Sequence, residues 1–355
     1  MSNLLDYLRW RGDLPRTAIP LGGVDGLILA QLSMLRWENA LREGESAPLE
    51  ALAPAMATKP VSEGFTAEND EKLLALAAPS RRFGGVTVGD YVNTVDDDST
   101  MQFAAVALRL PDGTTFASFR GTDSTLTGWK EDCNMAFSKP VPAQEAAAEY
   151  LNALARRYPG GLRVGGHSKG GNLAMYAASH MEDAARERLL AVYNYDGPGL
   201  SDRMDAPALY ARVTVRLHSY VPQGSVVGTL LAHPDEYTVV KSNSVSIWQH
   251  DPYSWQVEGP DFVTLAELSR DSARFDLTFR QWLAGLDEDD RALLVNRVFD
   301  VLCATNSRSF GQEFWAGLAR NPKSVFAAIQ GVDPEVRRRI AKMMLDLGAL
   351  ALKPQ

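Results

Sequence analysis

The sequence has few cysteines, no excess of positive charge and no long apolar run. Its 355 residues include two cysteines, Cys133 and Cys303, and neither has metal-ligand spacing. Two cysteines make no disulfide framework, so we expect a reducing, cytoplasmic setting. The net charge of −8 argues against nucleic acid as the main partner and gives no general attraction to anionic membranes. These shortages exclude a disulfide-stapled scaffold and disfavour a nucleic-acid-binding protein.

The sequence also lacks the usual signals for membrane insertion and export. No uncharged apolar run is long enough to cross a bilayer. Residues 1–11 lack a basic stretch followed by an uninterrupted apolar core, so we expect no secretory signal. Hydrophobic residues make up 45% of the chain and charged residues 23%, which is typical of a soluble globular protein. The length suffices for one large domain or for a domain with an appendage.

Apolar periodicity predicts alternating strands and helices through the middle of the chain, and therefore a mostly parallel sheet with right-handed crossovers. The expected strands are 84–95, 101–110, 114–120, 162–165, 189–195, 213–220 and 237–247. The expected helices before residue 160 are 3–11, 24–41, 69–78 and 145–158, with 46–60 irregular. From about residue 264 only helices are expected, at 277–286, 287–305, 310–320, 322–330 and 334–352. We thus expect one α/β domain over 1–265 and a helical subdomain or cover over 266–355.

A glycine-rich turn at 165–171 carries the strongest chemical signal. Gly166-x-Ser168-x-Gly170 follows an apolar strand and precedes a helix of small residues. This is the nucleophile-elbow pattern, in which a sharp strand-to-helix turn exposes a serine hydroxyl. The N–H of Lys169 then begins the helix, where it can donate to a developing oxyanion. The alternative is a βα turn that binds an anion or merely closes the unit.

A second stretch, 119–132, reads Phe-Arg-Gly-Thr-Asp-Ser, then Trp129 and Asp132. Together with the Gly-His-Ser-x-Gly-Gly elbow that follows it, it resembles the oxyanion loop of class 3 (fungal triacylglycerol-type) lipases. The chain resembles a bacterial branch of these lipase-like α/β hydrolases over about 101–255, with the N-terminal segment in the same domain. The resemblance implies an α/β-hydrolase fold and makes Thr122, through its N–H and hydroxyl, and the Lys169 N–H the oxyanion donors. Trp129 and Asp132 would hold the loop in shape, and Arg120 would pair with a carboxylate.

The general base is expected to be a histidine after the last strands of the sheet. The chain has five histidines: His167, His180, His218, His233 and His250. His250 lies in a loop and is followed by a proline and aromatic residues, which resembles the His-x-x-Tyr ending of the lipase family. His250 is therefore the predicted base, with His233 in reserve, and the other three are expected to be structural.

The acid is where the sequence departs from the lipase pattern. Ser225 stands where that family has an aspartate. We predict that Asp196, at the end of the strand after the elbow, takes the role instead, since neighbouring strand ends lie about 5 Å apart. Asp235 and Asp251 are weaker alternatives. Asp196 would otherwise cap the turn that follows it.

The predicted function is that of a serine hydrolase of carboxylic esters, with Ser168, His250 and Asp196 as catalytic residues. The resemblance narrows the substrate to acyl lipids or lysolipids, met as monomers or by transient contact with a membrane or micelle. No cofactor and no metal are expected. Two alternatives remain: a catalytically silent hydrolase fold that binds a lipid or protein partner, and a thioesterase or amidase.

Overall fold

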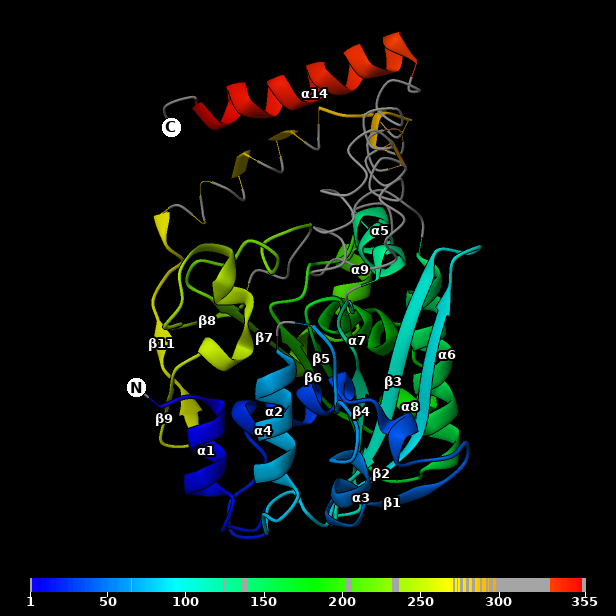
Figure 1. Cartoon of the computed structure of the whole chain (residues 1–355), viewed down its shortest axis with the longest axis vertical. Coiled ribbons are helices and arrows are strands. Elements are labelled where there is room, and N and C mark those ends of the chain that lie inside the picture. The colour runs from blue at the N-terminus through cyan, green and yellow to red at the C-terminus, as the bar shows by residue number, and fades with distance from the viewer. Residues whose placement is uncertain are drawn as a thin grey trace.

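A nine-stranded sheet with helices on both faces forms the body of the protein (Figure 1). The computed structural model describes residues 2–270 apart from 65, 124, 136–139, 202–205 and 232–235, then scattered positions between 272 and 297, and residues 333–352. The strands are β1 (Ser46–Pro48), β2 (Thr87–Asp96), β3 (Met101–Arg109), β4 (Thr115–Phe119), β5 (Leu162–His167), β6 (Leu189–Tyr195), β7 (Leu217–Pro222), β8 (Thr238–Val240) and β11 (Thr264–Leu265), with β9 (Val257–Glu258) and β10 (Asp261–Phe262) as a separate pair. The helices are α1 (Leu4–Arg11), α2 (Gly23–Gln31), α3 (Leu49–Met56), α4 (Ala67–Ala77), α5 (Leu126–Asn134), α6 (Pro142–Arg157), α7 (Lys169–Ser179), α8 (Asp183–Arg186), α9 (Ala206–Ala211) and α14 (Pro334–Leu352).

The strand directions define the fold class. Strands β4 to β8 pair in parallel and in chain order. Strands β1, β3 and β11 run against their neighbours, so β2 shares the direction of β4 to β8. The sheet is therefore mostly parallel, and the predicted α/β-hydrolase fold is confirmed. Parallel strands bring their carboxyl ends to one edge, which is where ligands bind in such sheets.

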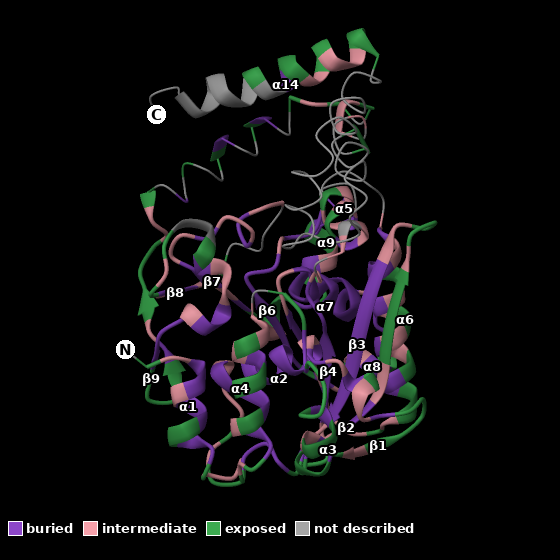
Figure 2. Ribbon diagram, in the orientation of Figure 1, coloured by how far each residue is buried: buried purple, intermediate pink, exposed green. Residues whose placement is uncertain are grey.

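Each face of the sheet has its own hydrophobic core, because strand side chains alternate between faces. Val106 and Leu108 of β3 pack with residues of α1, α2 and α4 on one face. Ala105 and Ala107 pack with residues of α6 and α7 on the other. Figure 2 shows β3, α2 and α7 as largely buried elements. Helix α7, which follows the elbow, is buried along its whole length.

Two N-terminal predictions are wrong in part. The expected helix 24–41 ends at Gln31 and continues only as the 3₁₀ turns Leu32–Met34 and Trp37–Asn39. The segment 46–60, expected to be irregular, contains β1 and α3 instead. Helix α3 forms although Pro54 lies inside it, because Leu49, Leu52 and Met56 are buried. Tertiary packing outweighs the local preference there.

The described residues test only some of the helices predicted for the C-terminal part of the chain. The last predicted helix is confirmed as α14, which ends at Leu352. The helices expected at 277–286 and 287–305 lie where few positions are described, and those at 310–320 and 322–330 lie outside the described residues. The boundary at residue 265 therefore stays a prediction. Among the described helices, none is both long and apolar enough to cross a membrane.

Candidate active site

Ser168 stands at a sharp turn between β5 and α7. Its backbone has φ 58° and ψ −131°, a conformation that residues with a side chain rarely adopt. Such strain gathers at functional sites, where the surrounding structure holds it in place. The N–H of Ser168 donates to the Tyr195 carbonyl oxygen at the end of β6 (2.9 Å). The serine is thus fixed at the carboxyl edge of the sheet.

Glycines let the helix pass close to the strands at this turn. A Cβ on Gly166 would lie 2.3 Å from the carbonyl carbon of Gly170, and one on Gly170 would lie 2.2 Å from the Phe119 carbonyl oxygen. Neither position has room for a side chain. The two outer glycines of the motif are therefore required by packing, as the elbow pattern predicts.

His250 and Asp196 are hydrogen-bonded. His250 Nδ1 donates to Asp196 Oδ2 over 2.6 Å. Asp196 is fully buried, whereas the His250 side chain is 25% exposed. Asp196 also has a positive φ, 50°, so it shares with Ser168 a strained backbone at neighbouring strand ends. The structure thus brings together the two residues predicted as base and acid, although they lie 54 residues apart.

The second carboxylate oxygen of Asp196 has its own donors. Ser225 Oγ donates to Asp196 Oδ1 (2.5 Å), and so does the Gly228 N–H (3.0 Å). The turn after β6 is capped by Asn194, whose Oδ1 accepts from the Gly197 N–H, so Asp196 is free of that role. Ser225, at the position of the missing family aspartate, therefore contacts the acid candidate and not the imidazole.

The other candidates lie elsewhere. Asp251 Oδ1 accepts from the Tyr253 N–H and makes no bond to the imidazole of His250. His180 stacks on a tyrosine of its own helix, and His218 stacks on one in the neighbouring strand. His233 and Asp235 lie outside the described residues.

Ser168 Oγ makes no hydrogen bond to any residue that the structure describes. The rings of His167 and His250 are 4.5 Å apart between centroids, so the base candidate lies beside the residue preceding the serine. Hydrogen bonds between a nucleophile and its base are often long without substrate and tighten when it binds.

The oxyanion residues meet at the elbow through their backbone. A Cβ on Gly121 would lie 3.4 Å from Ser168 Cβ, so Gly121 contacts the serine and Thr122 is the next residue along the loop. Within the described residues, the N–H groups of Thr122 and Lys169 donate to no other group. The Thr122 hydroxyl, which was expected to face the elbow as well, donates its proton to Asp132 Oδ2. Asp132 thus holds the loop, and Arg120 pairs with Asp123 (3.1 Å).

Asp132 has an unusual titration. Its Oδ1 is buried without a hydrogen-bond partner, although the side chain as a whole is 27% exposed. Burial raises the pKa of Asp132 from 3.8 to about 6, against the lowering effects of the Lys169 charge and the Thr122 hydrogen bond. Between pH 4 and 6, therefore, Asp132 is largely protonated in the folded protein and largely ionised in the unfolded chain.

The Asp132→Asn variant is expected to gain stability over wild type as the pH rises. Between pH 4 and 6 the native state binds the extra proton, so wild-type stability falls with rising pH. The free energy of unfolding of the variant should exceed that of wild type by near zero at pH 4 and by about 1–2 kcal/mol above pH 6, after allowance for the exposed part of the side chain. Urea unfolding at four pH values measures it, with Asp98→Asn, on an exposed loop tip, as the control. A difference that does not change with pH would contradict the assignment.

His167 makes a contact that the sequence did not predict. Its Nε2 donates to the main-chain oxygen of His250 over 2.8 Å. Burial lowers the pKa of His167 well below its usual range, and the neighbouring His250 lowers it further. His167 is thus a neutral support for the backbone of the base candidate. The only signal was its place inside the elbow, which gives no hint of a partner 83 residues away.

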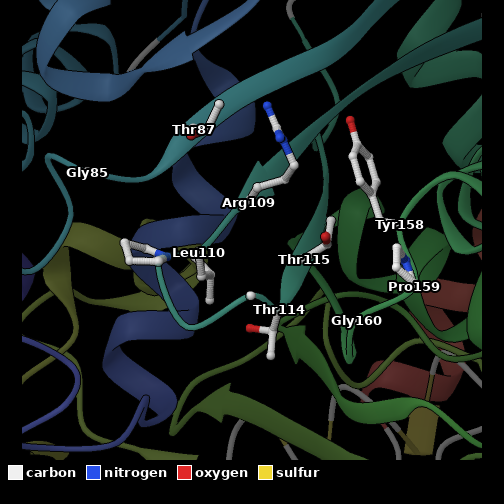
Figure 3. A pocket seen from close by; sticks show the side chains of 11 residues that line it. Gly85, Thr87, Arg109, Leu110, Thr114, Thr115, Tyr158, Pro159 and Gly160 are labelled. Atoms are coloured by element: carbon white, nitrogen blue, oxygen red, sulfur yellow. The ribbon is translucent and has the colours of Figure 1, made fainter.

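The described residues contain no cluster of His, Cys, Asp or Glu that would hold a metal ion. The structure also has a hollow of about 500 Å³, whose lining side chains are drawn in Figure 3. It is lined by Arg109, Thr115 and Tyr158 among others, at the end of β3 and the start of β4. Since β4 and β5 are parallel, this is the edge opposite Ser168. The hollow is therefore separate from the candidate site.

Comparison with known proteins identifies the family. The Mbeg1-like family model matches residues 77–300, which is more than half of the chain. The chain belongs to the Mbeg1-like family. The matched region contains Thr122, Ser168, Asp196 and His250. No curated protein matches this Mbeg1-like chain.

Solved structures of lipases share a distant likeness with the Mbeg1-like chain. M37 lipase is 13% identical, with 51% of this chain and 68% of the lipase covered and a TM-score of 0.35. A triacylglycerol lipase from Penicillium expansum is 14% identical, with 53% and 84% covered and a TM-score of 0.31. The Rhizomucor miehei lipase–propeptide complex is 14% identical, with 72% and 90% covered and a TM-score of 0.35. Likeness at this level assigns no activity to the chain.

The Mbeg1-like chain also supports its histidine loop from outside the matched region. Tyr253 OH, three residues after His250, donates to Asp70 Oδ1 of α4 (2.6 Å). Asp70 is fully buried and also accepts from the hydroxyls of Ser62 and Thr66. The N-terminal helices are therefore part of the structure that fixes the base candidate.

Proposed function

We propose that the protein is a serine hydrolase of carboxylic esters that works through an acyl-enzyme. The observation that carries the proposal is the 2.6 Å hydrogen bond between His250 Nδ1 and buried Asp196, beside a serine held at φ 58°. A strained serine, a histidine and a buried carboxylate at one sheet edge match the roles of nucleophile, base and orienting acid. The fold shows at which edge of the sheet the site lies, and it does not by itself assign an activity.

In the proposed reaction, Ser168 Oγ attacks the ester carbonyl carbon while His250 Nε2 takes its proton. The tetrahedral intermediate collapses, the C–O bond to the alcohol breaks, and His250 returns the proton to the leaving oxygen. Water, activated by the same histidine, then hydrolyses the acyl-serine. Asp196 keeps Nδ1 protonated, so that Nε2 is free to accept, and stabilises the imidazolium. Neutral His167 adds no second positive charge beside it.

The oxyanion would be held by the N–H groups of Thr122 and Lys169. Both belong to residues fixed beside Ser168, and both lack a partner within the described residues. Backbone donors set in advance at the point where charge develops contribute the largest single part of catalysis in many hydrolases.

The proposed substrates are acyl lipids or lysolipids. This rests on the lipase resemblance and on exposed apolar side chains beside the site, Trp248 at 61% and Trp129 at 40% exposure. Such side chains suit an acyl chain or transient contact with a micelle or membrane surface. A series of esters of increasing acyl length tests the class, which is wrong if only short soluble esters are hydrolysed. The proposed setting is the cytoplasm, as the scarcity of cysteine indicates.

A fluorophosphonate probe is expected to label the folded protein at Ser168. Peptide mapping of the adduct locates the label, and Ser168→Ala should abolish it. Ser99→Ala, which removes an exposed serine in the turn between β2 and β3, should still be labelled. Failure of the wild-type protein to react would refute the enzyme proposal in favour of a silent fold that binds a lipid or protein. Labelling without ester turnover would redirect the proposal to thioesters or amides.

A further inference from the structure

A buried ion pair lies directly beneath the elbow. Lys169 Nζ is 2.5 Å from Glu131 Oε2, and the two side chains are 1% and 0% exposed. Lys169 Nζ also donates to the carbonyl oxygen of Gln102 (2.7 Å) and approaches its Oε1 (3.3 Å). The ammonium group is therefore fully engaged in the interior and does not face the reacting edge as an acid, base or nucleophile.

Glu131 connects this lysine to three further elements. Its Oε2 also accepts from the Gln102 N–H of β3, and its Oε1 accepts from the Ala143 N–H of α6, both at 2.9 Å. Glu131 itself lies on α5, and Lys169 begins α7. One carboxylate thus fixes the start of the elbow helix against β3, α5 and α6.

The segment 131–132 also contacts Thr122, the other proposed oxyanion residue. Asp132, next to Glu131, accepts the hydroxyl hydrogen bond of Thr122. The Lys169 side chain and Asp132 are 3.9 Å apart at their nearest charged atoms. A continuous path of contacts therefore runs from the Thr122 loop through residues 131 and 132 to Lys169, whose own N–H is the second donor.

Stability alone gives a poor reason for such a pair. Removing two charges from water costs about as much as their attraction returns, and apolar side chains of similar size often replace buried pairs without loss. What an ion pair with several hydrogen bonds adds is a defined geometry. Oxyanion donors need that geometry, since displacement of a single donor costs about 10²–10³ in kcat.

We infer that the Lys169 side chain and Glu131 are positioning residues that set the separation of the Thr122 and Lys169 N–H donors. The inference rests on the proposed function and extends it to residues that never touch substrate. Neutralising the pair should leave ester binding intact and impair only the stabilisation of the tetrahedral state.

The test is the double variant Lys169→Met/Glu131→Gln, which removes both charges and keeps side-chain size. We expect kcat to fall about 100-fold, with KM within threefold of wild type. The inhibition constant of an alkyl boronic acid, which forms a tetrahedral adduct on the serine, should rise by a similar factor. The matched control is Asp25→Asn/Arg82→Met, which neutralises a fully buried pair between α2 and the segment before β2 and should leave kcat unchanged.

The outcomes separate the inference from the proposal beneath it. If wild-type protein reacts with the fluorophosphonate but the folded double variant keeps its kcat and boronate affinity, the positioning inference is overturned. If wild-type protein does not react, the proposed function fails first. Should the double variant not fold, Glu131→Gln alone decides: a tenfold fall in kcat supports the inference, and an unchanged kcat overturns it.

Discussion

Replacing Asp196 by asparagine is expected to lower kcat for ester hydrolysis by about 10⁴-fold. An amide in place of the carboxylate removes the charge that stabilises the imidazolium. It also presents an N–H to His250 Nδ1, which shifts the ring proton to Nε2. The imidazole then has no free nitrogen to accept the serine proton, although the side chains keep their positions.

The surroundings of Asp196 dictate which way the asparagine would turn. Ser225 Oγ and the Gly228 N–H both point at Oδ1, and both are donors. The amide oxygen is therefore held on that side and the NH₂ group faces His250. The same two donors that steady the carboxylate in the wild-type protein thus enforce the wrong tautomer in the variant.

The measurement is steady-state hydrolysis of a chromogenic ester, with thermal unfolding to establish that the variant is folded. Asp251→Asn is the matched control, since that carboxylate caps the next turn and does not bond to the imidazole. Its kcat should stay within a few-fold of wild type. A near-normal kcat for Asp196→Asn, together with a collapse for Asp251→Asn or Asp235→Asn, would show that the acid lies elsewhere.

The elbow could be predicted from the sequence because its determinants are local. Gly166 and Gly170 flank Ser168 in a five-residue motif, and the close contacts that require them lie within the turn or against the adjoining strand. The strands β4 to β6 were predicted within a residue or two for the same reason, since alternating apolar residues record burial directly. The later strands were predicted less well, since 213–220 begins with a 3₁₀ turn before β7 and 237–247 contains only the three residues of β8. Local patterns thus predicted the central strands, the turn and the candidate nucleophile.

The partners of the site were harder to predict because they come from distant loops. The sequence offered three aspartates for the acid, besides Ser225 at the family position, and only the folded chain shows that Asp196 contacts His250 while Ser225 contacts Asp196. The motif marked Lys169 for its N–H alone. A lysine beside a candidate nucleophile gives no sign that its side chain turns inward to Glu131, 38 residues earlier in the chain. The catalytic roles of all these residues remain predictions.

Replacing Arg82 by methionine is expected to lower the free energy of unfolding by about 3–5 kcal/mol. Arg82 and Asp25 form a bidentate pair, Nε to Oδ1 at 2.6 Å and Nη2 to Oδ2 at 2.5 Å, with both side chains essentially unexposed. Arg82 also donates to the carbonyl oxygens of Leu14, Ile19 and Pro20. The variant leaves a buried carboxylate without its counter-charge and three carbonyl oxygens without their donor.

Urea unfolding followed by circular dichroism and by tryptophan fluorescence measures this loss. The control is Arg9→Ala, whose ion pair with Asp6 is about half exposed and should contribute less than 1 kcal/mol. The Arg82 pair joins the matched family region to α2, which precedes it, and the core on that face combines residues of α1, α2 and α4 with sheet residues. The two probes should therefore report one shared transition, shifted as a whole in Arg82→Met. A shift below 1 kcal/mol would contradict the predicted cost of removing Arg82. Separate transitions for the N-terminal helices and the sheet would contradict the shared core, because Asp70 could not hold the His250 loop from a segment that unfolds on its own.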